Sequence, residues 1–272
     1  MSSRDELRFL LEDLGVYPGS LVYLHTSFRR VSYIDLGPTD FIEGLLEHIG
    51  SEGTLVMPCF SWHLDKQNRP WVGYRMYFET RPEFDVVNTA ANIGVIPETF
   101  RNLPQAKRSL NYWWSVASVG PLTDILTGGQ HLVEHPYGPG STFELLREHD
   151  VIILGLGVTL NTTSLAFVPD YHLGNHSVLT EDLQSGVVID EVGQRHETKS
   201  YWVLPNAVQQ VKPEVVFQRS ERLRSDLRRV DRNKTVQFAY HYRVYHEEAM
   251  RLGREAREKG MPHPWLEEYR PS

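Results

Sequence analysis

The sequence predicts an α/β protein in which a layered sheet of mostly parallel strands is flanked by helices. Three observations support this fold class. Segments with helical periodicity alternate with short strand-like segments in the N-terminal half. The run Val151–Leu154 is continuously apolar, which is typical of a strand covered on both faces. The 272 residues, 40% of them hydrophobic, suffice for one large core, so we predict a single domain over residues 1–272.

The first helices and strands are indicated by signals at their ends. Ser3–Glu6 has the pattern of a capping box, and Gly15 marks the end of the helix that it opens. A buried strand is expected over Leu21–His25. Thr39 is a candidate cap for a second helix, and Thr54–Met57 is expected to be the next strand.

The regular patterns stop between Cys59 and Glu83, where large aromatic side chains stand among polar residues. A loop of this length inside a domain is typical of a lid or a binding wall, although an aromatic plug packed on the core would give the same pattern. Beyond it we expect a helix over 91–101, a strand over 113–119 and a helix opened by the capping box Ser141–Glu144.

The C-terminal part of the chain is predicted to contain a β-hairpin region over residues 177–205, with turn residues at 190–193. A helical extension over 206–272 is expected to follow. Its helices are rich in Arg, Glu and Lys, which is typical of solvated helices. A subunit interface in a homodimer is the other role that we consider for them.

Composition excludes several classes of protein. The lone cysteine, Cys59, excludes an intramolecular disulfide and a thiolate metal cluster. A net charge of −7 argues against nucleic acid as the main partner, because phosphate binding requires clustered cations. The N-terminal residues are too polar for a signal peptide, and no apolar run approaches the roughly 20 residues of a membrane span. We therefore expect a soluble, cytoplasmic protein with no membrane partner.

Small and polar residues gather where several predicted strands end. His25-Thr26-Ser27 follows the first strand, Pro58-Cys59-Phe60-Ser61 the second, and Gly155-Leu156-Gly157 a later one that leads to Asn161-Thr162, a candidate helix start. Ligands of open α/β sheets bind beyond the carboxyl ends of strands. Hydroxyls and free amides at these ends suit a ligand with phosphate or carbonyl groups, whereas an ordinary turn at any one end would look the same. Neither glycine fingerprint of a nucleotide-binding fold is present.

An ordered set of short motifs resembles the aminoglycoside 3-N-acetyltransferase (antibiotic N-acetyltransferase) family. The motifs are Leu24-His25-Thr26-Ser27-Phe28, Gly53-Thr54-Leu55-Val56-Met57-Pro58, Phe84-Asp85, Gly94-Val95-Ile96-Pro97-Glu98-Thr99-Phe100-Arg101, Lys107-Arg108-Ser109, Val119-Gly120-Pro121, Tyr137-Gly138-Pro139-Gly140-Ser141, Leu154-Gly155-Leu156-Gly157 and Asn161-Thr162. They fall within residues 5–170 in the family's order. Each motif is weak alone, whereas the ordered set is specific for the fold.

The resemblance implies an enzyme that transfers an acyl group from acetyl-CoA, or another acyl-CoA, to an amine of a small molecule. It implies that a set of strand-end and loop residues binds the cofactor's pantetheine and phosphates: His25, Thr26, Ser27, Arg108, Ser109, Gly138, Ser141, Asn161 and Thr162. Within the site, Tyr137, Gly138 and Ser141 are placed near the acyl end. The reaction requires a base for the amine proton and hydrogen-bond donors for the carbonyl oxygen.

Two positions depart from the family's pattern. The family has a histidine after the Asn-Thr pair that acts as the base, and without gaps its position falls on Leu165, which cannot accept a proton. The family's usual His-Pro is replaced by Asn111-Tyr112. His172 is a candidate replacement base, with Asp170 or Glu197 as the carboxylate that orients it. A surface loop with exposed histidines is the competing interpretation.

Three further interpretations remain open at the sequence level. Asp170, His172, His176 and His63 could together hold zinc in a metal-dependent hydrolase, although the spacing is weak and we assign no metal. His63 and Asp65 are alternatives for the position at which the family binds substrate. A homologue that binds acyl-CoA without turnover is favoured by Leu165.

The acceptor is the least constrained part of the prediction. Between residues 59 and 83, basic side chains outnumber acidic ones in a chain that is acidic as a whole. A polycationic acceptor would favour carboxylates, so this composition favours a neutral or anionic acceptor, such as an amino sugar on a nucleotide carrier or an amine-bearing natural-product intermediate. Surface pairing of these cations with nearby carboxylates would explain the pattern equally well.

Overall fold

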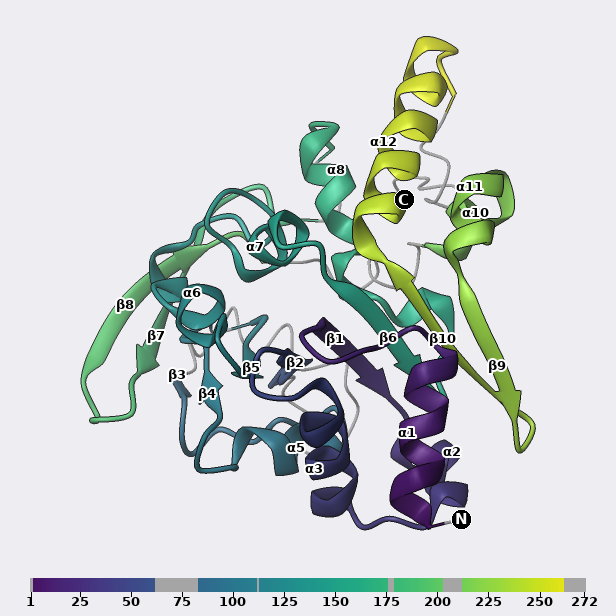
Figure 1. The fold of residues 1–272 in the computed structure, drawn as a ribbon. Coiled ribbons are helices and arrows are strands. Elements are labelled where there is room, and N and C mark those ends of the chain that lie inside the picture. Colours follow the sequence, from purple (N-terminus) through teal and green to yellow (C-terminus); the bar gives the residue numbers. More distant parts are fainter. Residues whose placement is uncertain (1, 62–82, 112, 176–178, 203–211, 262–272) are drawn as a thin grey trace, which may run out of the picture.

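The centre of the computed structural model is a seven-stranded sheet (Figure 1). The structure describes residues 2–61, 83–111, 113–175, 179–202 and 212–261. Across the sheet the strands are β4 (Lys107–Arg108), β5 (Val116–Val119), β2 (Thr54–Pro58), β1 (Leu21–Thr26), β6 (Ile152–Leu156), β10 (Thr235–His241) and β9 (Arg228–Arg232). The predicted α/β class is therefore confirmed.

Parallel pairing is confined to the middle of this sheet. β1 pairs in parallel with β2 on one side and with β6 on the other. The pairings of β2 with β5, β5 with β4, β6 with β10 and β10 with β9 are antiparallel. The sheet is thus mixed rather than mostly parallel. The strands that were predicted from apolar runs are the central ones, and they are buried on both faces.

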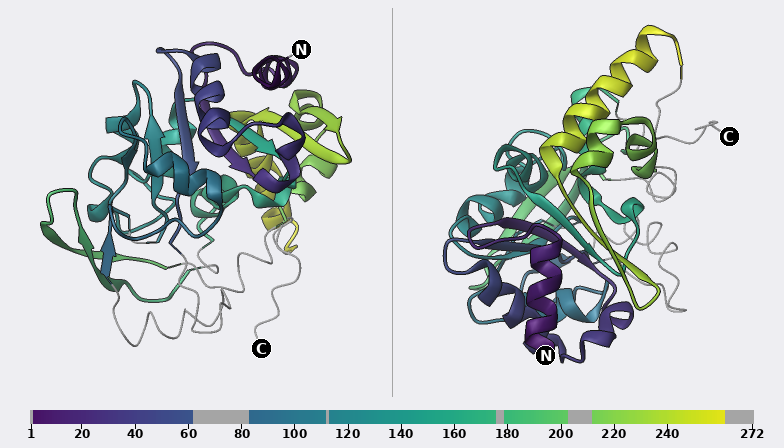
Figure 2. Two further views of the ribbon diagram at one scale, coloured as in Figure 1. Left: turned by 90° about the horizontal axis from the view of Figure 1, so that it is seen from below. Right: turned by 45° about the vertical axis from the view of Figure 1, so that its right-hand side comes forward.

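Helices cover both faces of the sheet, as Figures 1 and 2 show. One face carries α1 (Ser3–Asp13), α2 (Phe28–Val31), α3 (Pro38–Ile49) and α5 (Val95–Arg101), whose buried side chains share one core. The other face carries α6 (Thr123–Thr127), α7 (Thr142–Glu148), α8 (Val168–His172), α10 (Glu214–Arg219), α11 (Glu221–Asp226) and α12 (Tyr242–Glu258) around a second core. None of the described helices is long and apolar enough to cross a bilayer.

Several predicted boundaries shift in the structure. The capping box at the N-terminus is formed by Ser2 with Asp5, one residue before the predicted one. Gly37 precedes α3, whose first residue is Pro38, so Thr39 is inside the helix rather than at its cap. Proline favours the first helical position because its missing N–H has no partner there in any helix. The cap of α7 is as predicted, since Ser141 Oγ accepts from the Glu144 N–H.

Two predicted elements are shorter than expected. The helix predicted over 91–101 begins only at Val95, and the strand predicted over 113–119 begins at Val116. Trp113 and Trp114 lie in the preceding turn, where the Asn111 side chain accepts from both of their backbone N–H groups. An asparagine that bonds to the backbone two and three residues later favours a turn over an extended strand.

A smaller sheet stands beside the main one. β3 (Glu83–Asp85) pairs in parallel with β7 (Gln184–Ile189), which forms an antiparallel hairpin with β8 (Arg195–Ser200). The Asp190 carboxylate accepts from the Val192 and Gln194 N–H groups in the connecting turn. The long hairpin is seen at the left of Figure 1.

The predicted all-helical C-terminal extension is wrong over residues 228–241, which form the β9–β10 hairpin. Phe238 and Tyr240 pack on the second core, and Ala239 between them packs on the first, as the period of a strand requires. Asn233 and Lys234 connect the strands with φ values of 50° and 60°. A positive φ at both central residues is the conformation of the tight turns that favour hairpins, and asparagine tolerates it.

The Lys234→Gly variant is expected to be more stable than the parent protein by about 0.5–1 kcal/mol. Lysine pays a steric cost at positive φ that glycine avoids, and the turn lies on the surface. Urea unfolding measures the gain. The Lys199→Gly variant in β8 is the control and should lose stability, because glycine weakens a strand. Equal losses in both variants would contradict the assignment of this turn.

Candidate active site

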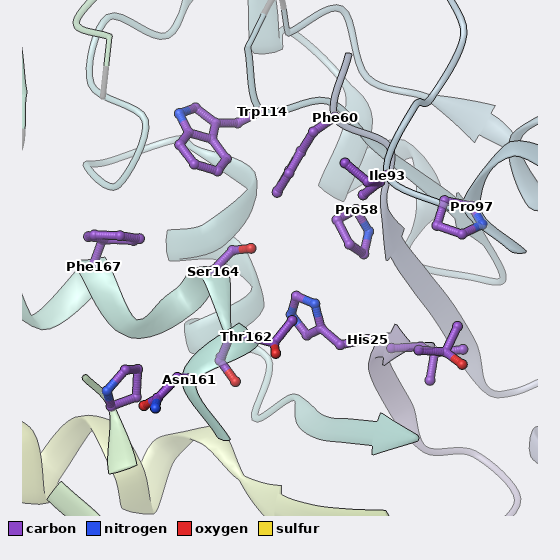
Figure 3. Close-up of a pocket in the computed structure, with 14 residues that line it drawn as sticks. His25, Pro58, Phe60, Ile93, Pro97, Trp114, Asn161, Thr162, Ser164 and Phe167 are labelled. Atoms are coloured by element: carbon purple, nitrogen blue, oxygen red, sulfur yellow. The ribbon is translucent and has the colours of Figure 1, made fainter. Parts of the chain in front are cut away.

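A cavity opens beyond the carboxyl ends of the central strands β1 and β2 (Figure 3). Its wall is part apolar and part polar, and the polar residues come from the end of β1 and from the turns after β6. The lining residues are Leu24, His25, Thr26, Pro58, Phe60, Ile93, Pro97, Trp114, Asn161, Thr162, Thr163, Ser164, Phe167 and Pro213. No carboxylate or permanently charged side chain stands among these lining residues.

Parallel pairing explains why the polar residues meet. β1 lies between β2 and β6 and runs in the same direction as both, so all three strands end at the same edge of the sheet. The segment Leu160–Thr162 that follows β6 is a single 3₁₀ turn rather than the start of an α-helix, and it carries Asn161 and Thr162 to the cavity. His25, Thr26, Asn161 and Thr162 thus share one wall, as the strand-end argument predicts.

His25 is the lining residue with the least conventional environment. Its side chain is buried, with 6% exposed, and its ring lies edge-on to that of Tyr23 at 4.9 Å between centroids. Burial lowers the pKa of His25 to about 3, so the imidazole is neutral at physiological pH. Across the pairing of β1 with β6 it faces Gly155, over which the ring of Phe238 lies. A side chain on Gly155 would overlap that ring.

Aromatic rings build the other wall of the cavity. Phe60 and Trp114 meet edge to face at 4.6 Å between centroids. Phe167 stacks on Tyr137 at 5.1 Å, so Tyr137 supports the wall from behind while remaining fully buried. These pairs favour a rigid, dry surface. The sequence prediction placed Tyr137 near the acyl end, whereas the lining ring is Phe167.

Some polar lining residues are also engaged in the fold. The Asn161 side-chain oxygen accepts from the Glu214 N–H at the start of α10. Thr163 Oγ1 accepts from the Tyr240 hydroxyl, whose pKa is raised by burial. These bonds hold the 3₁₀ turn against α10 and β10. The turn is therefore fixed by segments that are more than fifty residues away in sequence.

Arg108 and Ser109 were predicted to bind the cofactor, but neither lines this cavity. Ser109 is fully buried, and its hydroxyl accepts from the Val116 N–H. Arg108 is 5% exposed and donates to the Cys59 and Thr89 carbonyl oxygens. Their polar atoms thus connect the turn after β2 with β4 and β5. The structure gives both residues a part in the fold.

The remaining predicted cofactor residues are not among the residues that line the cavity. Ser27 stands before α2, and its N–H donates to the Leu156 carbonyl. Ser141 caps α7 and is buried. Gly138 is close to the Tyr171 ring, so a side chain at this position would have only 3.1 Å to the nearest ring atom. Their predicted role in cofactor binding is not tested by these contacts.

Sequence reasoning missed several lining residues. Ser164 and Phe167 belong to a second 3₁₀ helix, Ser164–Phe167, and Trp114, Ile93, Pro97 and Pro213 come from turns and helix starts far apart in sequence. No local pattern distinguishes such residues from ordinary core residues. For Ser164 and Phe167 the available signal was their position after the polar end of β6.

A model of the family described as aminoglycoside 3-N-acetyltransferase matches residues 23–250. The chain belongs to this family. It is 33% identical over 184 residues to aminoglycoside N(3)-acetyltransferase IV of Salmonella sp, a match that covers 65% of this chain and 64% of that protein. The chain therefore spans less than two thirds of the length of that relative.

The fold is that of solved aminoglycoside acetyltransferases. The crystal structure of aminoglycoside acetyltransferase AAC(3)-Xa superposes with a TM-score of 0.71 at 22% identity, covering 91% of each chain. The structure of AAC-IIIb in a binary complex with CoASH gives a TM-score of 0.70 at 20% identity, and the match covers 96% of this chain and 98% of that one.

Leu165 stands at the position where a histidine of the family was expected from the sequence. Leu165 is fully buried, and its carbonyl oxygen accepts from the Tyr242 hydroxyl at 2.7 Å. The segment from Ser164 is a 3₁₀ helix rather than the continuous α-helix assumed in the prediction. The side chain at this position therefore belongs to the core.

His172 lies at the end of α8 and does not line the cavity. Its Nδ1 is 2.8 Å from His246 Nε2 on α12, and its Nε2 is 3.3 Å from Glu144 Oε1 on α7. Its carboxylate partner is thus Glu144, in place of the predicted Asp170 or Glu197. Glu197 stands on β8 in the smaller sheet, and Asp170 is buried two residues before His172 in α8.

Three predicted site residues, His63, Asp65 and His176, lie outside the described residues, as does most of the aromatic loop. Within the described part of the chain, no group of three or more His, Cys, Asp or Glu side chains is arranged to hold a metal ion. The described residues therefore supply no third metal ligand beside His172 and Asp170, two members of the set considered for zinc.

Proposed function

We propose that this chain is a coenzyme A-dependent N-acetyltransferase that acylates an amine of a small molecule. The observation that carries the proposal is the cavity at the shared edge of β1, β2 and β6 in a chain of this family. One wall offers hydroxyl, amide and imidazole groups, and the other offers aromatic rings. Such a surface suits a long neutral arm with a carbonyl group at its end.

The acyl donor is the ligand that this wall fits best. A pantetheine arm carries amides and a thioester but no charge, so it gains from apolar contact and single hydrogen bonds. The lining residues supply both without a charged side chain. The AAC-IIIb structure with CoASH, which has the same fold, supports coenzyme A as the donor.

For the acceptor we propose an aminoglycoside amine as the first candidate, because the Salmonella relative is named for that activity. The described residues of the cavity wall include no carboxylate, a group that favours polycationic ligands, so we expect the ammonium groups of such an acceptor to be recognised by other residues. This lack favours a second candidate, an amine on a less cationic carrier such as a nucleotide-linked amino sugar.

The amine must lose a proton when it attacks the thioester. His172, which is hydrogen-bonded to His246 and lies 3.3 Å from Glu144 Oε1, was predicted to take the place of the family's histidine. Because His172 does not line the cavity, direct proton transfer from an amine bound there is not supported by its position. Its role as the base stays a prediction.

Thiol release from acetyl-CoA measures the proposed activity. We expect amine-dependent release with gentamicin, apramycin or kanamycin, and the second acceptor class predicts release with a nucleotide-linked amino sugar instead. The product is identified by a mass increase of one acetyl group on the amine. Release that does not depend on any amine, together with the absence of an acetylated product, would contradict the proposal. Reactions without protein correct for spontaneous hydrolysis.

A further inference from the structure

The imidazole of His25 carries a buried nitrogen, Nε2, that has no hydrogen-bond partner among the described residues. Leaving such a group unpaired costs about 1–3 kcal/mol. Most buried polar groups in native proteins are paired, so an exception at the wall of a cavity indicates a group reserved for a ligand.

The direction of the ring agrees with this interpretation. Figure 3 shows the His25 ring turned from the end of β1 toward Thr162 and Ser164 on the opposite turn, with Pro58 beside it. Among the described lining residues His25 is the one with an imidazole, and this ring is neutral at physiological pH. The ring therefore stands in the cavity wall next to small hydroxyl groups.

The chemistry of the ring limits what it does there. An imidazole whose protonated form is strongly disfavoured by burial is a poor proton acceptor and a good neutral donor through its N–H. The His25 ring contacts Tyr23, whose own pKa is raised by burial. This neutral neighbour does not stabilise a protonated imidazole. A neutral imidazole that polarises a carbonyl is an established catalytic device.

We propose that His25 donates a hydrogen bond from Nε2 to the carbonyl oxygen of the acyl thioester bound in this cavity. This role rests on the proposed acyltransfer. When the amine nitrogen attacks, the C–N bond forms and an electron pair moves to that oxygen, where the donor stabilises it. The C–S bond then breaks, the oxygen regains its double bond, and coenzyme A leaves as a thiol while the nitrogen loses one proton.

Two substitutions separate this role from a structural one. His25→Gln keeps a neutral N–H donor at nearly the same reach, whereas His25→Phe keeps the ring but removes the donor. We expect kcat to fall about 10²–10³-fold in His25→Phe, as when one donor to a developing oxyanion is removed, and at most about tenfold in His25→Gln. The exposed His149→Gln variant is the matched control. Equal losses in the Gln and Phe variants, or none in either, would overturn the proposal.

A second measurement does not depend on turnover. Acetyl-CoA labelled with ¹³C at the acetyl carbonyl is bound to each protein, and the carbonyl resonance is recorded. A hydrogen bond to the oxygen moves the resonance downfield in the parent and His25→Gln proteins but not in His25→Phe. If acetyl-CoA binds with this shift and no amine is acetylated, the acceptor proposal fails and the role of His25 stands. Binding without the shift in the parent protein overturns the role of His25, and no binding at all overturns the proposed function.

Discussion

Replacing Arg108 by methionine is expected to lower the free energy of unfolding by about 3–5 kcal/mol. The guanidinium is 5% exposed and donates to the side chains of Ser115 and Ser61 and to the carbonyl oxygens of Cys59, Thr89 and Val86. Methionine has a similar length but no donors, so buried acceptors on several segments would lose their partner together. Each such loss costs about 1–3 kcal/mol before relaxation.

The charge of Arg108 is retained despite its burial. Burial lowers the pKa of Arg108 to about 10, so the group stays protonated at pH 7. Its guanidinium also lies 4.7 Å from the centre of the Phe84 ring, which favours a cation. The acceptors come from the turns after β2 and β3 and from the start of β5, so this one side chain joins the main sheet to the smaller one.

The adjacent Lys107 provides a matched control for the Arg108→Met variant. Lys107 is on the same short strand, but its side chain is 45% exposed and pairs with the exposed Asp124. Lys107→Met should change stability by less than about 1 kcal/mol. Urea unfolding monitored by tryptophan fluorescence compares the two. If Arg108→Met left stability unchanged but weakened coenzyme A binding, the sequence-based assignment of Arg108 to the cofactor would be correct instead.

Local patterns predicted those parts of the fold that depend on local chemistry. The Ser141 cap, the buried strand after Val151 and the polar ends of β1 and β6 all follow from hydrogen-bonding capacity or periodicity within a few residues. The meeting of His25 with Asn161 also follows, because neighbouring parallel strands end at one edge.

The rest depends on contacts between distant segments. Arg108 resembles a ligand-binding arginine in sequence, and only the approach of Cys59 and Thr89 turns it inward. The Arg- and Asp-rich strand β9 has no apolar run, and it forms because β10 pairs with it and covers the core. The carboxylate beside His172 comes from α7 for the same reason, since the helices meet only in the folded chain.

The contact between His172 and His246 predicts an acid-sensitive fold. His246 belongs to α12, where it contacts His172 and lies near the Tyr242 ring. The positive charges of Arg147 and Arg254 disfavour its protonation. Burial is the main cause of the low pKa of His246, about 3, and the charges of these neighbours lower it further. In the unfolded chain a histidine titrates near ~6.5. Protons therefore bind the unfolded state preferentially between these two values.

The stabilisation is fully present above pH 6.5 and is lost as the pH falls toward 3, because the folded-state pKa is the lower one. Linkage gives a loss of about 2 kcal/mol at pH 5 and about 3 kcal/mol at pH 4, relative to pH 7.5, from this group alone. His25 adds a loss of the same sign, so a variant is needed to isolate His246. Glutamine at position 246 keeps a polar group beside His172 but does not titrate.

Urea unfolding of the parent and His246→Gln proteins at pH 7.5, 5 and 4 measures this contribution. At pH 7.5 the variant is expected to be the less stable protein by about 0.5–1.5 kcal/mol, since a buried hydrogen bond is altered. This difference in stability should shrink and then reverse in sign as the pH falls, because protonation of His246 costs free energy only in the folded parent protein. The exposed His149→Gln protein should follow the parent at every pH. Parallel curves for the parent and His246→Gln would mean that His246 accepts its proton in the folded state with little cost, and the contact with His172 would then not restrain its titration.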